Sequence, residues 1–158
     1  MKLLTLDYPS PETVASYRID TERRVRTEVY EGAVTLSDIR SVMAAMVSDP
    51  CWSPDFHALI DFSGAQLDMS ANDVLRLALL LKQEENRSRG WLAFVATTSA
   101  TYGIVRMLGV WSRTSERLQI FQSRQDAESW LQRNVDRRPP GIADAAPANP
   151  ADKLRSAV

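Results

Sequence analysis

The centre of the predicted sheet is the run Phe56-His57-Ala58-Leu59-Ile60-Asp61-Phe62. It is apolar without regular alternation, a pattern typical of a strand that other elements cover on both faces. Ser63-Gly64 is expected to end this strand, and Ser70 then stands three residues before Asp73. That spacing indicates a capping box, in which two side chains satisfy backbone donors of the first helical turn. A buried strand and a helix beginning after Ser70 are therefore predicted.

Two strands and one helix are predicted before this run. Apolar and polar residues alternate over residues 15–20 and 25–30, as in half-buried strands, and the polar cluster between them favours a hairpin. Thr35 and Asp38 then have the capping spacing, and apolar residues at helical intervals follow. A helix over residues 36–47 is the expectation.

Two strands and two helices are predicted after it. The apolar run over residues 91–96 predicts a second doubly covered strand, and residues 118–121 predict a short last one. Ser99 is expected to cap a helix that reaches about residue 112. Ser123 has the same relation to the final helix, whose inner stripe consists of Ala127, Trp130 and Leu131.

This order of elements predicts an α/β fold. After the hairpin, helices and strands alternate, which implies parallel strands joined by right-handed crossovers. We expect a mixed five-stranded sheet, with an N-terminal antiparallel hairpin, mainly parallel remaining strands and four helices. The domain is expected to span residues 1–136. Residues 137–158 are rich in Pro and Ala and poor in apolar bulk, so a disordered tail is predicted.

Composition disfavours several classes of function. The chain has 19 Lys and Arg against 20 Asp and Glu, so no overall field would attract nucleic acid. The cluster Arg23, Arg24 and Arg26 is interpreted as solvated surface. No apolar run approaches the length of a membrane helix, and the N-terminal segment does not resemble a secretory leader. We expect a cytoplasmic protein without an integral membrane segment.

Catalytic and cofactor motifs are not found. No glycine-rich phosphate loop occurs, and no cofactor or metal is predicted. The single cysteine, Cys51, and the single histidine, His57, flank one loop, and we interpret them as a small buried thiol and an ordinary histidine. Asp61 and Asp68 could share a cation or acid and base roles, or could be one strand-end and one loop carboxylate. An enzyme is the least favoured class.

Two helices carry more apolar surface than one core requires. In the helix after Ser70, one side already supplies a core stripe, yet further leucines lie on both flanks. The next helix has a similar excess, and its glycines Gly103 and Gly109 are expected to allow close packing. The surplus residues, predicted to form an interface or an apolar ligand cleft, are Leu75, Leu79, Leu80, Tyr102, Met107 and Trp111.

The segment from Leu59 to Ser70 resembles the STAS, or SpoIIAA-like, superfamily, in which a buried strand ends in an Asp-apolar-Ser phrase before a serine at a helix start. The phrase from Tyr30 to Leu36 is similar to bacterial STAS/SEC14-type small proteins. The resemblance covers residues 13–134 and implies a regulatory phosphoacceptor at Ser70. Related proteins carry an Asp-Ser-Ser-Gly-like phrase where this chain reads Asp68-Met69-Ser70-Ala71-Asn72. The candidate loop site consists of Asp61, Ser63, Asp68 and Asn72.

These patterns predict a non-catalytic protein-interaction or regulatory module. Its expected partner is another protein or a second copy of the chain, with a dimer favoured. The alternative is a carrier or sensor of a small apolar molecule bound between the two apolar helices, which the SEC14-type resemblance also implies.

Overall fold

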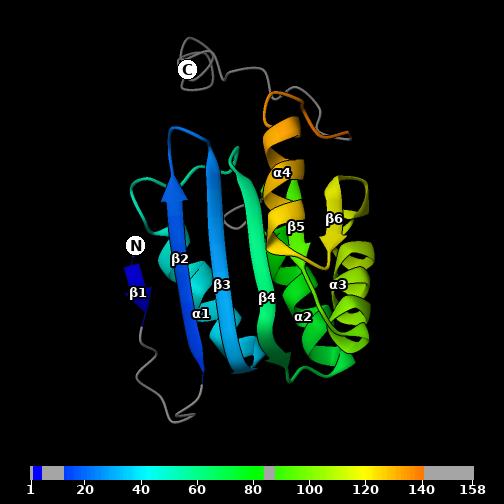
Figure 1. The fold of residues 1–158 in the computed structure, drawn as a ribbon. Coiled ribbons are helices and arrows are strands. Elements are labelled where there is room, and N and C mark those ends of the chain that lie inside the picture. The colour runs from blue at the N-terminus through cyan, green and yellow to red at the C-terminus, as the bar shows by residue number, and fades with distance from the viewer. Residues whose placement is uncertain (1, 5–12, 84–87, 141–158) are drawn as a thin grey trace, which may run out of the picture.

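The computed structural model describes residues 2–4, 13–83 and 88–140 (Figure 1). The sheet contains β1 (Lys2–Leu4), β2 (Val14–Asp20), β3 (Val25–Val34), β4 (His57–Leu67), β5 (Leu92–Val95) and β6 (Leu118–Phe121). The helices are α1 (Leu36–Val47), α2 (Ala71–Lys82), α3 (Ser99–Ser112) and α4 (Arg124–Asn134). A short 3-10 turn, η2 (Ser115–Arg117), precedes β6. Most of the predicted tail lies outside the described residues.

The predicted α/β class and mixed sheet are confirmed. All five expected strands and all four expected helices are present, and β1 adds a sixth strand at one edge. The strands lie in chain order, β1 to β6. The pairs β1–β2 and β2–β3 are antiparallel, whereas β3 to β6 run parallel. The hairpin between β2 and β3 turns through Arg24, which takes a left-handed backbone conformation with φ of 56°.

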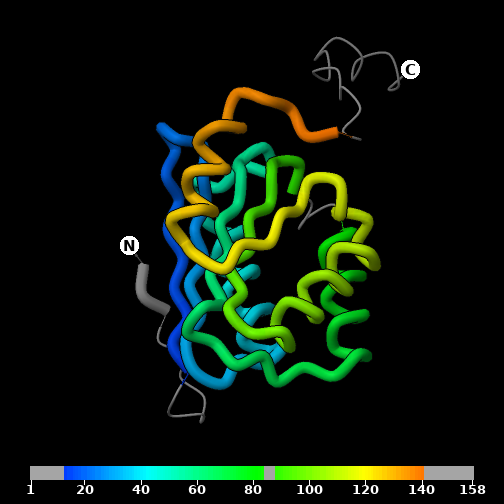
Figure 2. The backbone as a smooth tube through the Cα atoms, turned by 45° about the vertical axis from the view of Figure 1, so that its right-hand side comes forward, coloured from blue at the N-terminus to red at the C-terminus, as the bar shows by residue number. Residues whose placement is uncertain are grey.

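Helices cover both faces of the sheet, but unequally. Helices α1, α2 and α3 lie on one face and α4 lies on the other (Figures 1 and 2). Because β3 to β6 are parallel and ordered consecutively, three crossovers of the same hand place their helices on the same side. Helix α4 follows the last strand and is free to return over the opposite face.

Each face has its own hydrophobic core. The larger core lies beneath α1, α2 and α3 and includes Tyr30, Val42, Phe62, Val74 and Phe94. The smaller core lies beneath α4 and consists of Leu59, Ala93, Val95, Ala127 and Leu131, with Trp91 and Trp130 packed at its margin. Strands β4 and β5 contribute to both cores, which explains their unbroken apolar runs.

Local capping signals set the starts of the helices. Thr35 and Ser70 form capping boxes with Asp38 and Asp73, and the Ser123 hydroxyl accepts the Asp126 N–H. The start of α3 differs from the expectation. Its N-cap is Thr98, whose hydroxyl accepts the N–H of Thr101, so the prediction of Ser99 as the cap was wrong by one residue.

Strand β4 is longer than predicted. It continues through Ser63-Gly64 to Leu67, because its second half pairs in parallel with the end of β3. The register shifts between Val29 and Glu31, so β4 carries an irregularity where the apolar run ends. The sequence pair that was expected to end the strand therefore marks this change of register instead.

Candidate functional site

Ser70 lies on the surface at the start of α2, near the carboxyl end of β4. Its hydroxyl accepts the N–H of Asp73 at 3.2 Å and donates to that carboxylate at 2.9 Å. The Asp73 carboxylate also accepts the Ser70 N–H at 3.0 Å. These hydrogen bonds, first from the Ser70 backbone and then from its hydroxyl, lower the pKa of Asp73. Ser70 is therefore both exposed and engaged as an N-cap.

The other candidate loop residues lie in different environments. Asp61 is buried on the α4 face of β4, where its carboxylate accepts the Ser63 N–H at 2.9 Å and lies 3.7 Å from Arg124. Asp68 and Asn72 are exposed before and within the first turn of α2. Within the described residues, no group of three His, Cys, Asp or Glu residues has the geometry to hold a metal ion.

Cys51 and His57 occupy different environments. Cys51 is exposed, so its interpretation as a buried thiol was wrong. His57 is buried, and its Nδ1 accepts the Trp91 N–H at 3.0 Å. That nitrogen already holds a hydrogen bond within the sheet, so it is not available as a base for a nucleophile. The described hydrogen bonds include none between Cys51 and His57.

The helical surplus splits into an exposed part and a packed part. Leu80, Met107 and Trp111 are partly buried and pack against the larger core. The other three, Leu75 (42%), Leu79 (54%) and Tyr102 (44%), remain exposed, and so does Val110 (62%), a further apolar residue of α3. We call these four residues the docking face. Helices α2 and α3 are neighbours, and Arg106 lies 6.0 Å above the Tyr102 ring.

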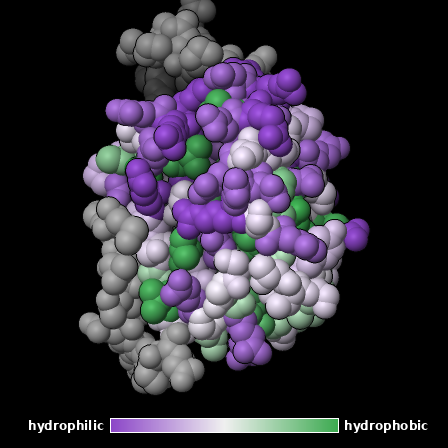
Figure 3. All heavy atoms as spheres, in the orientation of Figure 1, coloured by the Kyte–Doolittle hydropathy of each residue, from purple (hydrophilic) through white to green (hydrophobic). Residues whose placement is uncertain are grey.

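The side of the molecule that carries α4 is mainly polar. Figure 3 shows the face that carries α4, where hydrophilic side chains predominate and apolar ones form scattered spots. A groove of about 590 Å³ runs between α4 and the strands β2 and β3. Its arginines face carboxylates: Arg18 and Arg23 lie 4.0 and 3.9 Å from Asp20, and Arg24 lies 3.3 Å from Asp136. These ion pairs leave the groove without a concentrated charge of one sign.

A partly open pocket of about 70 Å³, which we call the interior cavity because most of its lining residues are buried, lies between the sheet and the helices α1, α2 and α3. Its wall contains a charged network from β3. Arg26 donates to the Glu28 carboxylate, and the Tyr30 hydroxyl donates to the second carboxylate oxygen at 2.8 Å. Arg26 is only 8% exposed and Glu28 4%, so the interpretation of Arg26 as solvated surface was wrong. The residues proposed for an apolar cleft, from Leu75 to Trp111, do not line this cavity.

Burial determines the protonation state of Tyr30. Desolvation, followed by the nearby Glu28 carboxylate and the hydrogen bond to it, raises the pKa of Tyr30 well above its usual value. The phenol therefore remains protonated and keeps donating to Glu28.

Two polar atoms around the cavity have no hydrogen-bond partner among the residues that the structure describes. They are Nε1 of Trp52 and Oγ of Ser88, both shielded from solvent. Buried polar groups in folded proteins are normally satisfied, so such atoms indicate a place for a bound molecule or water. Sequence reasoning missed this site, although one signal was present: residues 26, 28 and 30 alternate in a strand and must share one face.

The strand order and helix placement are those of the SpoIIAA-like fold, which the chain adopts. It is similar to the crystal structure of an uncharacterized protein of the DUF3478 family from Shewanella loihica PV-4, which has a SpoIIAA-like fold. The TM-score is 0.53 at 18% sequence identity, covering 78% of this chain and 98% of that chain. At that identity, the likeness concerns the fold alone. No protein-family model and no curated protein matches the chain.

Across residues 2–4, 13–83 and 88–140, no helix has both the length and the apolar character needed to cross a membrane.

Proposed function

We propose that this protein is a non-catalytic interaction module that binds a protein partner, most simply a second copy of itself, through the docking face. The exposure of four large apolar side chains on two adjacent helices supports this proposal. Large exposed apolar side chains on neighbouring elements commonly mark protein-binding surfaces. Ser70 starts the same helix α2, so a phosphate added there would place about two negative charges beside the docking face.

Replacing Leu75 and Leu79 together by glutamate is expected to abolish self-association. Both side chains are exposed in the single chain, so the fold should survive, whereas two charges would enter the interface. Burial of one leucine contributes about 1.5–3 kcal/mol, so the dissociation constant should rise by about 100-fold or more. Light scattering at micromolar concentration measures the change of mass.

The matched control is Val14→Glu, which changes an apolar residue of similar exposure on β2, away from the docking face. It should leave the mass of the assembly unchanged. A wild-type chain that remains monomeric at these concentrations would contradict the homodimer. Loss of association in the Val14→Glu variant as well would show that the docking face is not the interface.

A second candidate function is supported by the interior cavity. We propose that it binds a small neutral molecule with an apolar body and a hydroxyl or carbonyl oxygen. The cavity wall is mainly apolar, Arg26 and Glu28 neutralise each other, and the unpaired donors Trp52 Nε1 and Ser88 Oγ suit an oxygen acceptor. A charged ligand would lose its hydration, and the third charged side chain of the wall, Arg117, already donates to the Gly90 carbonyl.

Titration with 1-butanol is expected to shift the Trp52 indole N–H resonance in a saturable way. The substitution Leu81→Phe, at a residue that lines the cavity, should fill the space and abolish the shift. Leu79→Phe on the exposed side of the same helix serves as the control and should retain it. A shift that grows linearly with the alcohol concentration in the wild type and in both variants would be a solvent effect and would reject this candidate function.

A further inference from the structure

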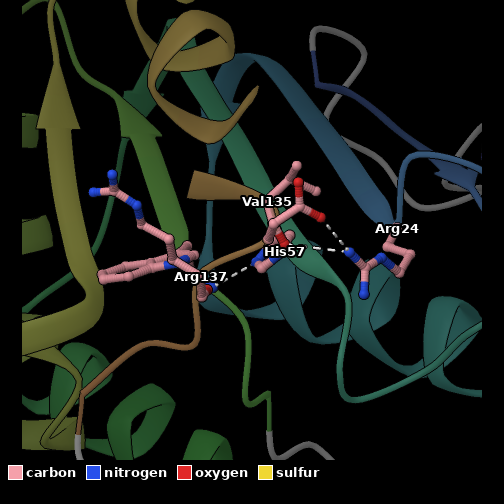
Figure 4. Close-up of polar contacts among 6 residues, drawn as sticks. Arg24, His57, Val135 and Arg137 are labelled. Carbon is pink, nitrogen blue, oxygen red and sulfur yellow. Dashed lines mark hydrogen bonds and ion pairs between the residues drawn. The ribbon is translucent and has the colours of Figure 1, made fainter. Parts of the chain in front are cut away.

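The chain that leaves α4 crosses the edge of the sheet where the parallel strands begin. We call residues 135–137 the strap. They are held by three residues at the starts of three strands: Arg24 immediately before β3, His57 at the start of β4 and Trp91 immediately before β5. Figure 4 shows His57 and Val135 close together, with Arg24 on one side of them and Arg137 on the other.

The hydrogen bonds of His57 require one protonation state. Nε2 lies 3.0 Å from the Val135 carbonyl oxygen, which can only accept, so Nε2 carries the proton. Nδ1 lies 3.0 Å from the Trp91 backbone N–H, which can only donate, so Nδ1 carries a lone pair. Both contacts are satisfied together only by the neutral Nε2–H tautomer.

The remaining strap contacts come from the neighbouring strands. Arg24 Nη2 donates to the Val135 carbonyl and to the Asp136 carboxylate, each at 3.3 Å. Trp91 Nε1 donates to the Arg137 carbonyl at 2.8 Å. Helix α4 itself fully buries two residues, Ala127 and Leu131. The strap therefore adds hydrogen bonds to the packing that holds α4 on the sheet.

Protonation of His57 would break this arrangement. The second proton must bind Nδ1, where it would point at the Trp91 N–H and turn a hydrogen bond into donor–donor repulsion. Burial and the Arg24 guanidinium also oppose the imidazolium, whereas the Val135 carbonyl and the Asp136 carboxylate favour it. Burial has the largest effect, so the pKa of His57 lies below its ordinary value.

We propose that His57 is an acid-sensitive latch whose protonation releases the strap and α4 from the sheet. Release would separate the rings of Trp91 and Trp130, which are in T-shaped contact with centroids 5.4 Å apart. It would also expose Leu59 and Val95 on the face of the sheet that α4 covers. The larger core, on the other face, contains no residue of α4 and would stay folded. The latch does not depend on the docking face or the interior cavity.

The direction of the pH effect follows from linkage. The released state binds the proton with the ordinary histidine pKa of about 6.5, and the latched state binds it more weakly. The latch is therefore fully effective above about pH 6.5 and weakens as the pH falls toward the lower pKa of the latched state. Within that window the opening equilibrium should change by up to about tenfold per pH unit.

Hydrogen exchange on the full chain at several pH values tests this latch. After correction for intrinsic exchange rates, amides of α4 are expected to lose protection below about pH 6.5, while those of α1 and α2 keep theirs. His57→Gln provides the matched variant, because the glutamine amide can both donate and accept but does not titrate in this range. Protection of α4 in that variant should not depend on pH between about 5 and 8, where histidine changes its charge.

Three results of the exchange experiment would overturn the latch. These are α4 protection that is constant in the wild type, the same pH dependence in His57→Gln, or a parallel loss of protection over the whole chain. If His57→Gln does not fold, the wild type still gives an answer by NMR. His57 is the single histidine, so its ring resonances titrate alone, and the Trp91 indole N–H must move with the same midpoint. An indole resonance that does not follow the His57 titration would also reject the latch.

Discussion

Replacing Glu28 by alanine is expected to lower the free energy of unfolding by about 3–5 kcal/mol. The change leaves the Arg26 guanidinium buried without its carboxylate, and it removes the acceptor of the Tyr30 hydroxyl. An uncompensated buried charge is among the most destabilising defects in a protein core. Urea unfolding at neutral pH, followed by circular dichroism, measures the loss.

The matched control removes both charges together. The double variant Arg26→Met and Glu28→Leu replaces the buried pair by apolar side chains of similar size, which should be less destabilising than Glu28→Ala alone, since only the Tyr30 hydroxyl is then left without a partner. Tyr30→Phe tests the third member and should cost about 1–3 kcal/mol, because one carboxylate oxygen loses its donor. A Glu28→Ala variant as stable as the wild type would show that the network is hydrated rather than buried.

The starts and ends of several elements were predictable because their signals are local. The capping spacing at Thr35, Ser70 and Ser123 satisfies backbone donors within one helical turn, whatever the rest of the chain does. The span of α1 was predicted correctly for this reason. The extension of β4 beyond Phe62 was not, because it depends on pairing with β3, which lies far away in sequence.

The candidate sites depend still more on tertiary structure. Periodicity identified an apolar surplus on α2 and α3, but only packing divides it, leaving Leu75 exposed and placing Trp111 against the core. Arg26 follows two surface arginines in the sequence, and its burial results from the register of β3 beneath α1. The partners of His57 come from residues 34 and 78 positions away, so no local pattern could have paired them.

The two ends of the parallel strands have different properties. The carboxyl end holds the capped starts of α1, α2 and α3, with Ser70 exposed. The amino end holds the strap and the buried His57. The two proposed sites also lie on different faces of the sheet, because the docking face belongs to α2 and α3 whereas the latch holds α4. Strands β4 and β5, which contribute to both cores, connect the two faces.

The amino end also contains Gly90, a glycine with very close backbone neighbours. A Cβ built on Gly90 would lie 2.7 Å from the carbonyl carbon of Phe56 and 2.8 Å from Cα of His57, and closer still to the Phe56 oxygen. All three are backbone atoms, so no side-chain rotation relieves the overlap. Gly90→Ala is therefore expected to push the starts of β4 and β5 apart and to lower the free energy of unfolding by more than about 3 kcal/mol.

Gly103 provides the opposite case and the control. It lies in the middle of α3, and a Cβ there meets nothing within 4 Å, so the expectation that this glycine allows close packing was wrong. Gly103→Ala should raise the free energy of unfolding by about 0.5–1 kcal/mol, since alanine costs less backbone entropy in a helix. Chemical denaturation of both variants measures whether each substitution lowers or raises the free energy of unfolding. The steric contact of the Gly90 site with the Phe56 and His57 backbone is the reason for expecting opposite signs. Equal effects of the two substitutions would mean that the backbone around Gly90 can move to make room for the methyl group.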